Sequence, residues 1–147
     1  MKFQFRFASI LQLRRQARDD AGMAVGQAVA AIARIDEQRQ EIETQRETLR
    51  ERDAQRTGAI SVDSLLANGR YDLQLLAESD SLFETRQKLL QELDRRKQAL
   101  TTAEAEVKRF EKLEDKDRAE FQAEQAKLEQ TQLDEATSRR YAMLRRR

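Results

Sequence analysis

The fold is decided by residues 70–147, RYDLQLLAESDSLFETRQKLLQELDRRKQALTTAEAEVKRFEKLEDKDRAEFQAEQAKLEQTQLDEATSRRYAMLRRR, a stretch without one Gly or Pro. Apolar residues return within it on a seven-residue line: Leu93, Leu100, Val107, Phe121 and Leu128. A second line contains Leu89, Ala103 and Phe110, so that the two lines alternate at spacings of four and three. This alternation is typical of the a and d positions of a coiled coil. The stretch therefore predicts one very long helix that lies against a partner helix.

The first half of the chain supplies the partner helix. Its apolar residues follow the same spacing of three and four: Val25, Ala28, Ile32, Ile35, Ile42 and Leu49. Charged residues also occupy the predicted seam, among them Arg39, Arg46 and Arg96. Such residues can specify the register of the two helices. Alternatively, their long side chains reach solvent at little cost.

Helix-breaking residues separate the two halves in TGAISVDSLLANGRY, residues 57–71. Ser61 is predicted to cap a short helical turn, which Asn68 and Gly69 then terminate. We therefore predict an all-α fold, a long antiparallel two-helix coiled-coil hairpin with a short helical turn in the connecting loop. Helix one is expected over about 4–57, the loop over 58–70 and helix two over about 71–144, in a single elongated domain, residues 1–147.

The composition argues against an enzyme. Charged residues make up 37% of the chain, against about 25% in ordinary domains, and there is neither Cys nor His. Disulfides, common zinc sites and the usual general base near neutral pH are therefore excluded. Carboxylate pairs on a solvated helix face have no pocket to tune their pKa values. We expect no catalytic residues, no cofactor and no metal.

The sequence also shows no recognisable targeting signal. The N-terminal residues MKFQFRFASILQLRR contain no uninterrupted apolar segment of the kind found in signal peptides. No apolar run approaches the roughly 18 residues needed to span a bilayer. We therefore expect a cytoplasmic protein.

Positive charge is concentrated at both ends of the chain. The first 18 residues contain five bases and no acid, and five Arg residues lie between positions 139 and 147. An antiparallel hairpin brings both termini to one end, which should be strongly basic. Matching the two arms from a turn near residue 63 places the start of helix one opposite residues near 122. The last part of helix two should then project alone, with its apolar residues available to dock another protein: Leu133, Tyr141, Met143 and Leu144. The alternative is a frayed, solvated tail.

The N-terminal aromatic residues admit two interpretations. Phe3, Phe7, Ile10 and Leu11 share one face of a helix beside Lys2, Arg6 and Arg14, which is typical of a helix on an anionic membrane surface. Peripheral membrane association is therefore one possibility, and packing at the open end of the hairpin is the other and is favoured.

Binding of the basic end to nucleic acid would depend on phosphate contacts alone. The chain has no Gly-rich phosphate loop, aromatic stacking platform or zinc-finger spacing. We therefore expect no specific nucleic-acid partner.

Three segments resemble the flagellar export protein FliJ family: FRFASILQLRRQARDDA (5–21), GRYDLQLLAESDSL (69–82) and KRFEKLEDKDRAEFQAEQAKLEQTQLDEATSRR (108–140). In that family an aromatic-rich N-terminus leads into a Leu-Arg helix, a Tyr follows the loop, an EKL segment lies on the return helix and a DE pair precedes an Arg-containing tail. The matching positions here are Phe3 to Arg14, Tyr71, Glu111 to Leu113, and Asp134 with Glu135.

The resemblance implies a non-catalytic component of the flagellar type III export apparatus, similar to the central stalk of rotary ATPases. Its location would be cytoplasmic, peripheral to the inner membrane at the flagellar basal body. It would insert its terminal end into the hexameric export ATPase ring and promote ring assembly and ATPase activity. The cytoplasmic domain of the export-gate membrane protein and export chaperones would be its other partners.

On this resemblance, the ATPase is expected to bind a set of residues near both termini: Arg14, Arg15, Leu133, Asp134, Glu135, Arg139 and Arg140. The export gate is expected to bind Tyr71, Leu75 and Leu82. Because Leu75, Leu82 and Leu89 are seven residues apart, ordinary packing against helix one is the favoured alternative for the leucines. The competing function is a structural or scaffolding coiled coil that self-associates, with two hairpins burying their exposed apolar faces against each other.

Overall fold

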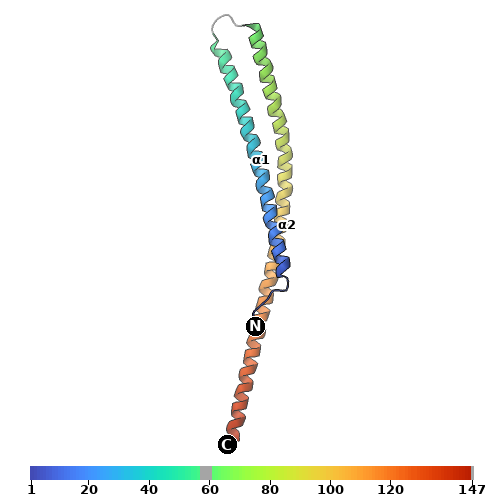
Figure 1. Cartoon of the computed structure of the whole chain (residues 1–147), viewed down its shortest axis with the longest axis vertical. Coiled ribbons are helices and arrows are strands. Elements are labelled where there is room, and N and C mark those ends of the chain that lie inside the picture. The colour runs from blue at the N-terminus through green and yellow to red at the C-terminus, as the bar shows by residue number, and fades with distance from the viewer. Residues whose placement is uncertain (57–60, 147) are drawn as a thin grey trace. The chain divides into compact units, whose positions relative to one another are not determined.

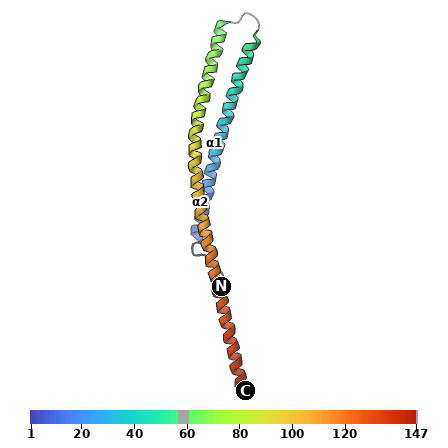
Figure 2. The same ribbon diagram turned by 180° about the vertical axis from the view of Figure 1, so that it is seen from behind.

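The computed structural model describes residues 1–56 and 61–146 of the chain. These residues form two helices, α1 (Ala8–Gln55) and α2 (Val62–Arg145), and contain no strand. Helices α1 and α2 run antiparallel (Figures 1 and 2). The predicted all-α hairpin of two long helices is therefore confirmed.

The chain divides into two compact units. The hairpin unit is Asp19–Thr101, and the terminal unit combines Met1–Arg18 with Thr102–Arg147. Each unit has its own buried residues, and each is described by itself below. A single elongated domain over residues 1–147 stays a prediction.

The core of the hairpin unit consists of the predicted seam residues. Five apolar side chains are buried in this unit: Ala28, Ile32, Ile35, Ile42 and Leu75. The four from α1 follow one another at spacings of three, four and seven, so they share one face of the helix. The predicted seam of helix one is therefore confirmed at these positions.

Charged residues link α1 to α2 across the same unit. Arg46 Nε donates to Asp72 Oδ1 at 2.9 Å, and Arg86 Nε donates to Asp36 Oδ1 at 2.7 Å. Arg96 Nη1 donates to the carbonyl oxygen of Ala24 at 2.7 Å. All three contacts fit one antiparallel register, because positions later in α1 pair with positions earlier in α2. The seam arginines at 46 and 96 thus contribute interhelical bonds in addition to reaching solvent.

The connection between the helices differs from the prediction. Ser61 does cap a helix, since its Oγ accepts from Ser64 N at 3.4 Å and its carbonyl oxygen accepts from Leu65 N at 3.2 Å. That helix is α2 itself, which begins at Val62 and continues through Asn68 and Gly69. The predictions of a separate helical turn and of a helix start at 71 were therefore wrong.

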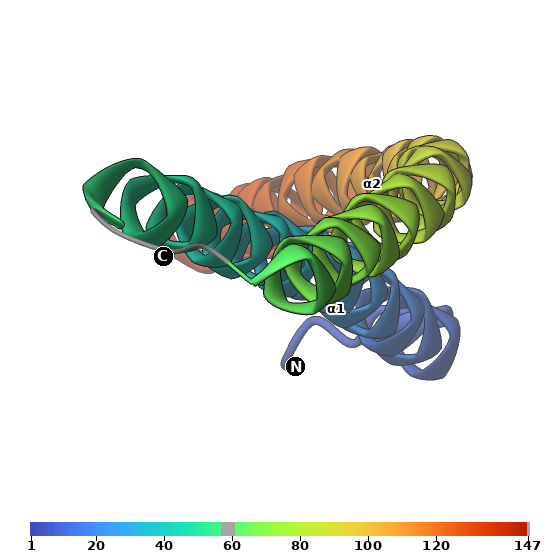
Figure 3. The ribbon, with the colours of Figure 1, turned by 90° about the horizontal axis from the view of Figure 1, so that it is seen from above.

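Long-range contacts explain why the helix does not end at Gly69. Asn68 Nδ2 donates to Asp53 Oδ1 of α1 at 2.9 Å, so the Asn side chain bonds across the hairpin instead of closing a turn (Figure 3 shows the end of α1 beside the beginning of α2). A Gly inside a helix costs only about 1 kcal/mol, which such contacts can offset. Helix α1 ends at Gln55, and the predicted end at Thr57 and the loop residues 58–60 lie outside the described residues.

The terminal unit begins with a non-helical segment, Met1–Phe7, which ends in a turn closed by a hydrogen bond from Ala8 N to the Phe5 carbonyl oxygen at 3.2 Å, and α1 starts at Ala8 instead of near residue 4. The ring of Phe3 lies 5.6 Å from that of Phe121, and the ring of Phe7 lies 6.4 Å from that of Phe110. The two partner rings are separated by about 16 Å along α2. Residues 3–7 cover about 13 Å when extended but only about 6 Å as a helix. A non-helical segment can span more of α2 than a helix of the same length and lets both rings reach it, and the predicted helical start was wrong.

Candidate protein-binding sites

The first residues of the chain are held on α2 within the terminal unit. In addition to the ring contacts of Phe3 and Phe7, Arg6 Nε lies 3.9 Å from Asp117 Oδ2, and the guanidinium of Arg118 lies 5.3 Å from the centre of the Phe3 ring. The non-helical N-terminal segment therefore reaches Phe121, whereas α1 itself starts beside Phe110, about three helical turns short of the position near 122 predicted for the start of helix one. Packing at this end is the observed role of Phe3 and Phe7, and membrane association stays a prediction.

Beyond this contact lies the tail, residues 126–146, in which every side chain is exposed. The tail is helical as far as Arg145 and extends past the N-terminal segment of the same unit (Figure 1). Leu133, Tyr141 and Leu144 are each more than 60% exposed. The tail thus has the single-helical form and the uncovered apolar side chains that the sequence predicts.

The residues expected to bind the ATPase all belong to the terminal unit but form two separate groups. Arg14 is exposed, and Arg15 Nη2 lies 3.4 Å from Glu111 Oε1 on α2. The remaining residues lie in the exposed tail: Leu133, Asp134, Glu135, Arg139 and Arg140. Along α2, Leu133 is about 33 Å from Glu111. A single partner that contacts both groups must therefore cover several turns of α2.

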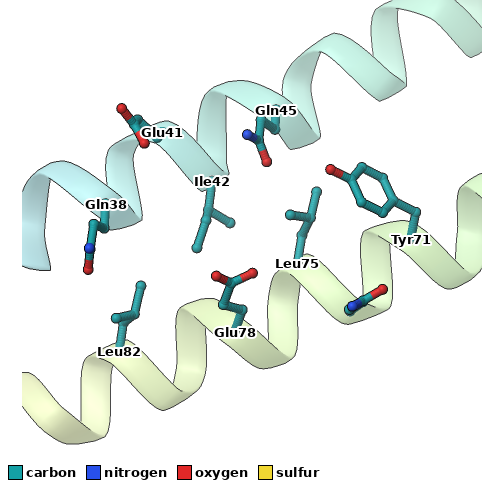
Figure 4. A pocket seen from close by; sticks show the side chains of 9 residues that line it. Gln38, Glu41, Ile42, Gln45, Tyr71, Leu75, Glu78 and Leu82 are labelled. Atoms are coloured by element: carbon teal, nitrogen blue, oxygen red, sulfur yellow. The ribbon is translucent and has the colours of Figure 1, made fainter.

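The residues expected to bind the export gate come together in the hairpin unit. Tyr71, Leu75 and Leu82 line a groove of about 370 Å³ between α1 and α2, opposite Ile42 (Figure 4). Polar side chains surround it: Gln38, Glu41, Gln45, Gln74 and Glu78. Leu75 is only 4% exposed and belongs to the helix seam, whereas Tyr71 is 45% exposed. Of the three, Tyr71 is the side chain that a partner can reach most directly.

A further surface on the hairpin unit was not predicted from the sequence. We call it the α2 stripe, and it consists of exposed apolar side chains near the start of α2: Val62, Leu65, Leu66, Leu73, Leu76 and Phe83. Successive helical residues are about 100° apart, which places these side chains on one flank, centred roughly 120° from the seam residue Leu75. The sequence did contain a signal for this surface, because several of these residues follow a second apolar line with spacings of three, four and seven. The stronger pattern of the seam residues obscured it.

The described part of the chain contains neither a cluster of metal-binding side chains nor a membrane-spanning helix. Residues 1–56 and 61–146 contain no group of three or more Asp or Glu side chains placed to hold a metal ion. In the same residues, neither helix has an apolar segment long enough to cross a membrane.

The family relationship follows from a match that covers nearly the whole chain. Residues 2–146 match the family described as the flagellar FliJ protein. The chain belongs to the FliJ family. Membership makes it a flagellar, export-related coiled-coil protein, and the family is structural and non-catalytic. No curated protein and no solved structure matches the chain.

Proposed function

We propose that this FliJ-family chain is a non-catalytic, stalk-like component of the flagellar type III export apparatus. It inserts the tail of its terminal unit into the ring of the export ATPase and promotes ring assembly and ATP hydrolysis. It also links the ring to the export gate and to export chaperones, in the cytoplasm at the inner-membrane face of the basal body. The observation that carries this proposal is the exposed helical tail of a chain that matches the family over residues 2–146.

The tail has the chemistry of a docking helix. Leu133, Tyr141 and Leu144 are spaced by eight and three residues, so they share one face. Arg140 stands beside that face, Arg139 lies on the opposite side of the helix, and both are exposed. Apolar anchors surrounded by charges are typical of protein interfaces, in which the apolar groups supply affinity and the charges supply orientation and association rate.

The groove at Tyr71 is the proposed gate-binding site. The phenol of Tyr71 is accessible at the edge of the groove. Leu75, Leu82 and Ile42 form the apolar floor of the groove. A gate segment that places an apolar side chain against Tyr71 would bury the ring and keep its hydroxyl available for a hydrogen bond.

The ATPase role is tested with the flagellar export ATPase of the same organism, with and without the chain, at matched salt. We expect the full chain to increase ATP hydrolysis and ring assembly, and a chain truncated after Lys127 to lose both effects. Met23→Gln is a matched control, because Met23 is an exposed apolar residue of the hairpin unit. Stimulation that survives the truncation would contradict insertion of the tail.

The gate role is tested by comparing Tyr71→Ser with Leu75→Ala in binding to the cytoplasmic domain of the gate protein. Tyr71→Ser should weaken binding while helicity, measured by circular dichroism, is kept. Leu75→Ala should instead lower the free energy of unfolding by about 2–4 kcal/mol, because it empties a buried seam position. Unchanged binding by the folded Tyr71→Ser variant would rule out the groove as the gate-binding site. Tyr141→Ser, which changes an exposed tyrosine of the tail, is the control.

A further inference from the structure

The α2 stripe is an apolar surface that the chain's own α1 leaves open. Its six side chains are between 38% and 69% exposed and occupy the first six turns of α2. At a rise of about 1.5 Å per residue the stripe is roughly 30 Å long, and a helix is about 10 Å wide, giving a patch of about 300 Å². This is the size of the largest apolar patch on a typical soluble monomer, and such patches are often functional. The same area is well below the roughly 800 Å² per partner of a standard stable interface, so a single docked helix fits it better than a second hairpin.

The charged residues beside the stripe are mostly acidic, which favours a basic partner. Residues 62–84 contain one base, Arg70, and several acids: Asp63, Asp72, Glu78, Asp80 and Glu84. Asp80 and Glu84 follow the outer flank of the stripe and form no ion pair with any described residue. On the flank towards α1, the guanidinium of Arg39 lies 5.1 Å from the Phe83 ring centre, and Arg46 is bonded to Asp72. The complement of this surface is an amphipathic helix with apolar residues on one face and arginines beside them.

The tail of the same chain is a helix of this kind. Its apolar face carries Leu133, Tyr141 and Leu144, with Arg140 beside that face and Arg139 on the other side of the helix. The tail contains five bases and three acids, Glu129, Asp134 and Glu135, and its positive charge is concentrated in residues 139–146. Both arginines are exposed, and neither forms an ion pair with a described residue. The acidic stripe and the net positive tail, whose bases lie mainly at its C-terminal end, are thus two uncovered apolar faces of complementary charge on one chain.

We infer that the tail of one copy docks on the α2 stripe of a second copy. Both surfaces belong to the continuous helix α2, so a tail reaches only the stripe of another molecule while that helix stays intact. The contact is heterologous, because two different surfaces meet, and each added copy leaves one stripe and one tail free. Association is therefore open-ended and grows with protein concentration. It also occupies the tail that we propose for the ATPase ring, although the inference does not depend on that proposal.

The first test is sedimentation velocity of the full chain over a range of concentrations and at two salt concentrations. We expect the mean sedimentation coefficient to rise with concentration and to fall when salt is added, since salt screens the charges. Leu66→Gln with Leu73→Gln should weaken association by at least about tenfold, because two apolar side chains are lost from the contact. Met23→Gln with Val29→Gln, which changes two exposed apolar residues of α1, should leave it unchanged.

Charge reversal identifies the two surfaces. Asp80→Arg with Glu84→Arg should weaken association, and so should Arg139→Glu with Arg140→Glu in a separate chain. A mixture of the two variants should associate again, because the intact tail of the first variant can dock on the intact stripe of the second, and the two charge-reversed surfaces also have opposite charges. Circular dichroism confirms that both variants remain helical.

Three results would overturn the inference. The first is a chain that stays monomeric at every concentration. The second is association that persists after truncation at Lys127, which would indicate contact between two stripes or two hairpins. The third is a mixture of charge-reversed variants that associates no better than either variant alone.

Discussion

At the scale of single residues, Arg46 and Asp72 form the best-defined charged contact of the hairpin unit. The Arg46 side chain is only 15% exposed, and its Nη1 also lies 3.5 Å from Glu43 Oε2. The hydrogen bond from Arg46 lowers the pKa of Asp72 below its usual value, partial burial opposes this shift, and the positive charges of Arg46 and Arg50 add to it. The same hydrogen bond raises the pKa of Arg46. The pair therefore favours the charged forms of both residues in the folded hairpin.

This shift predicts a pH-dependent effect of Asp72→Asn. Because the folded-state pKa of Asp72 is below the unfolded value of about 4, its contribution to stability is complete above that value and is lost as the pH falls through the folded pKa. The free energy of unfolding should therefore differ between wild type and variant at pH 7 and converge towards pH 2. Urea unfolding at a series of pH values measures the difference. Asp80→Asn, at an exposed position that forms no ion pair with a described residue, should show no such convergence, and a wild-type advantage that is constant with pH would contradict the assignment.

At the scale of elements, α2 tolerates a Gly in its interior because contacts on either side of it hold the helix. Asn68 bonds to Asp53, and Asp72 bonds to Arg46, so both neighbouring turns are fastened to α1. A Cβ added to Gly69 would meet nothing within 4 Å. The Gly is therefore not required for space or for a left-handed backbone.

Gly69→Ala should consequently stabilise the protein. Ala has the higher helix propensity and restricts the unfolded chain, so the free energy of unfolding should rise by about 0.5–1 kcal/mol. Denaturant unfolding followed by circular dichroism provides the measurement. Ala77→Gly, the reverse change at an exposed position of the same helix, should lower the free energy of unfolding by a similar amount. Destabilisation by Gly69→Ala would instead show that a helix end at this position is important.

At the scale of the whole molecule, the described residues bury little. The buried hydrophobic side chains are Leu11, Ala28, Ile32, Ile35, Ile42, Leu75 and Val107, and no polar residue among the described positions is buried. None of them belongs to the tail, whose side chains are all exposed. Stability therefore resides in the seam and in the N-terminal ring contacts.

Truncation after Lys127 should accordingly leave the melting temperature within about 2 °C of the full chain, because no buried contact is removed. Thermal unfolding at low protein concentration, where self-association is weak, measures this effect. Removal of residues 1–7 is the comparison and should lower the melting temperature, because it uncovers Phe110 and Phe121. A large loss of stability on truncating the tail would mean that the tail packs against the rest of the chain.

Much of the architecture could be predicted from local patterns. Seam residues such as Ile35, Ile42 and Leu75 recur with the helical period, and the exposed tail followed from the unequal lengths of the two arms. The residues proposed for ATPase and gate binding came from the family resemblance, and their roles remain to be tested. Partners such as Asp72 for Arg46 could not be identified, because many acids in the chain have suitable spacing.

The sequence by itself determined that two long helices pair in an antiparallel hairpin, because helix propensity and apolar periodicity are properties of neighbouring residues. Only the tertiary structure decided that Met1–Phe7 is not helical, that α2 begins at Val62 and that the α2 stripe stays uncovered. Each of these features depends on contacts between distant residues. Phe3 and Phe7 must reach rings far apart on α2, Asn68 must find Asp53, and α1 covers only one face of α2. Local propensity carries no information about such contacts, so the structure was needed to define them.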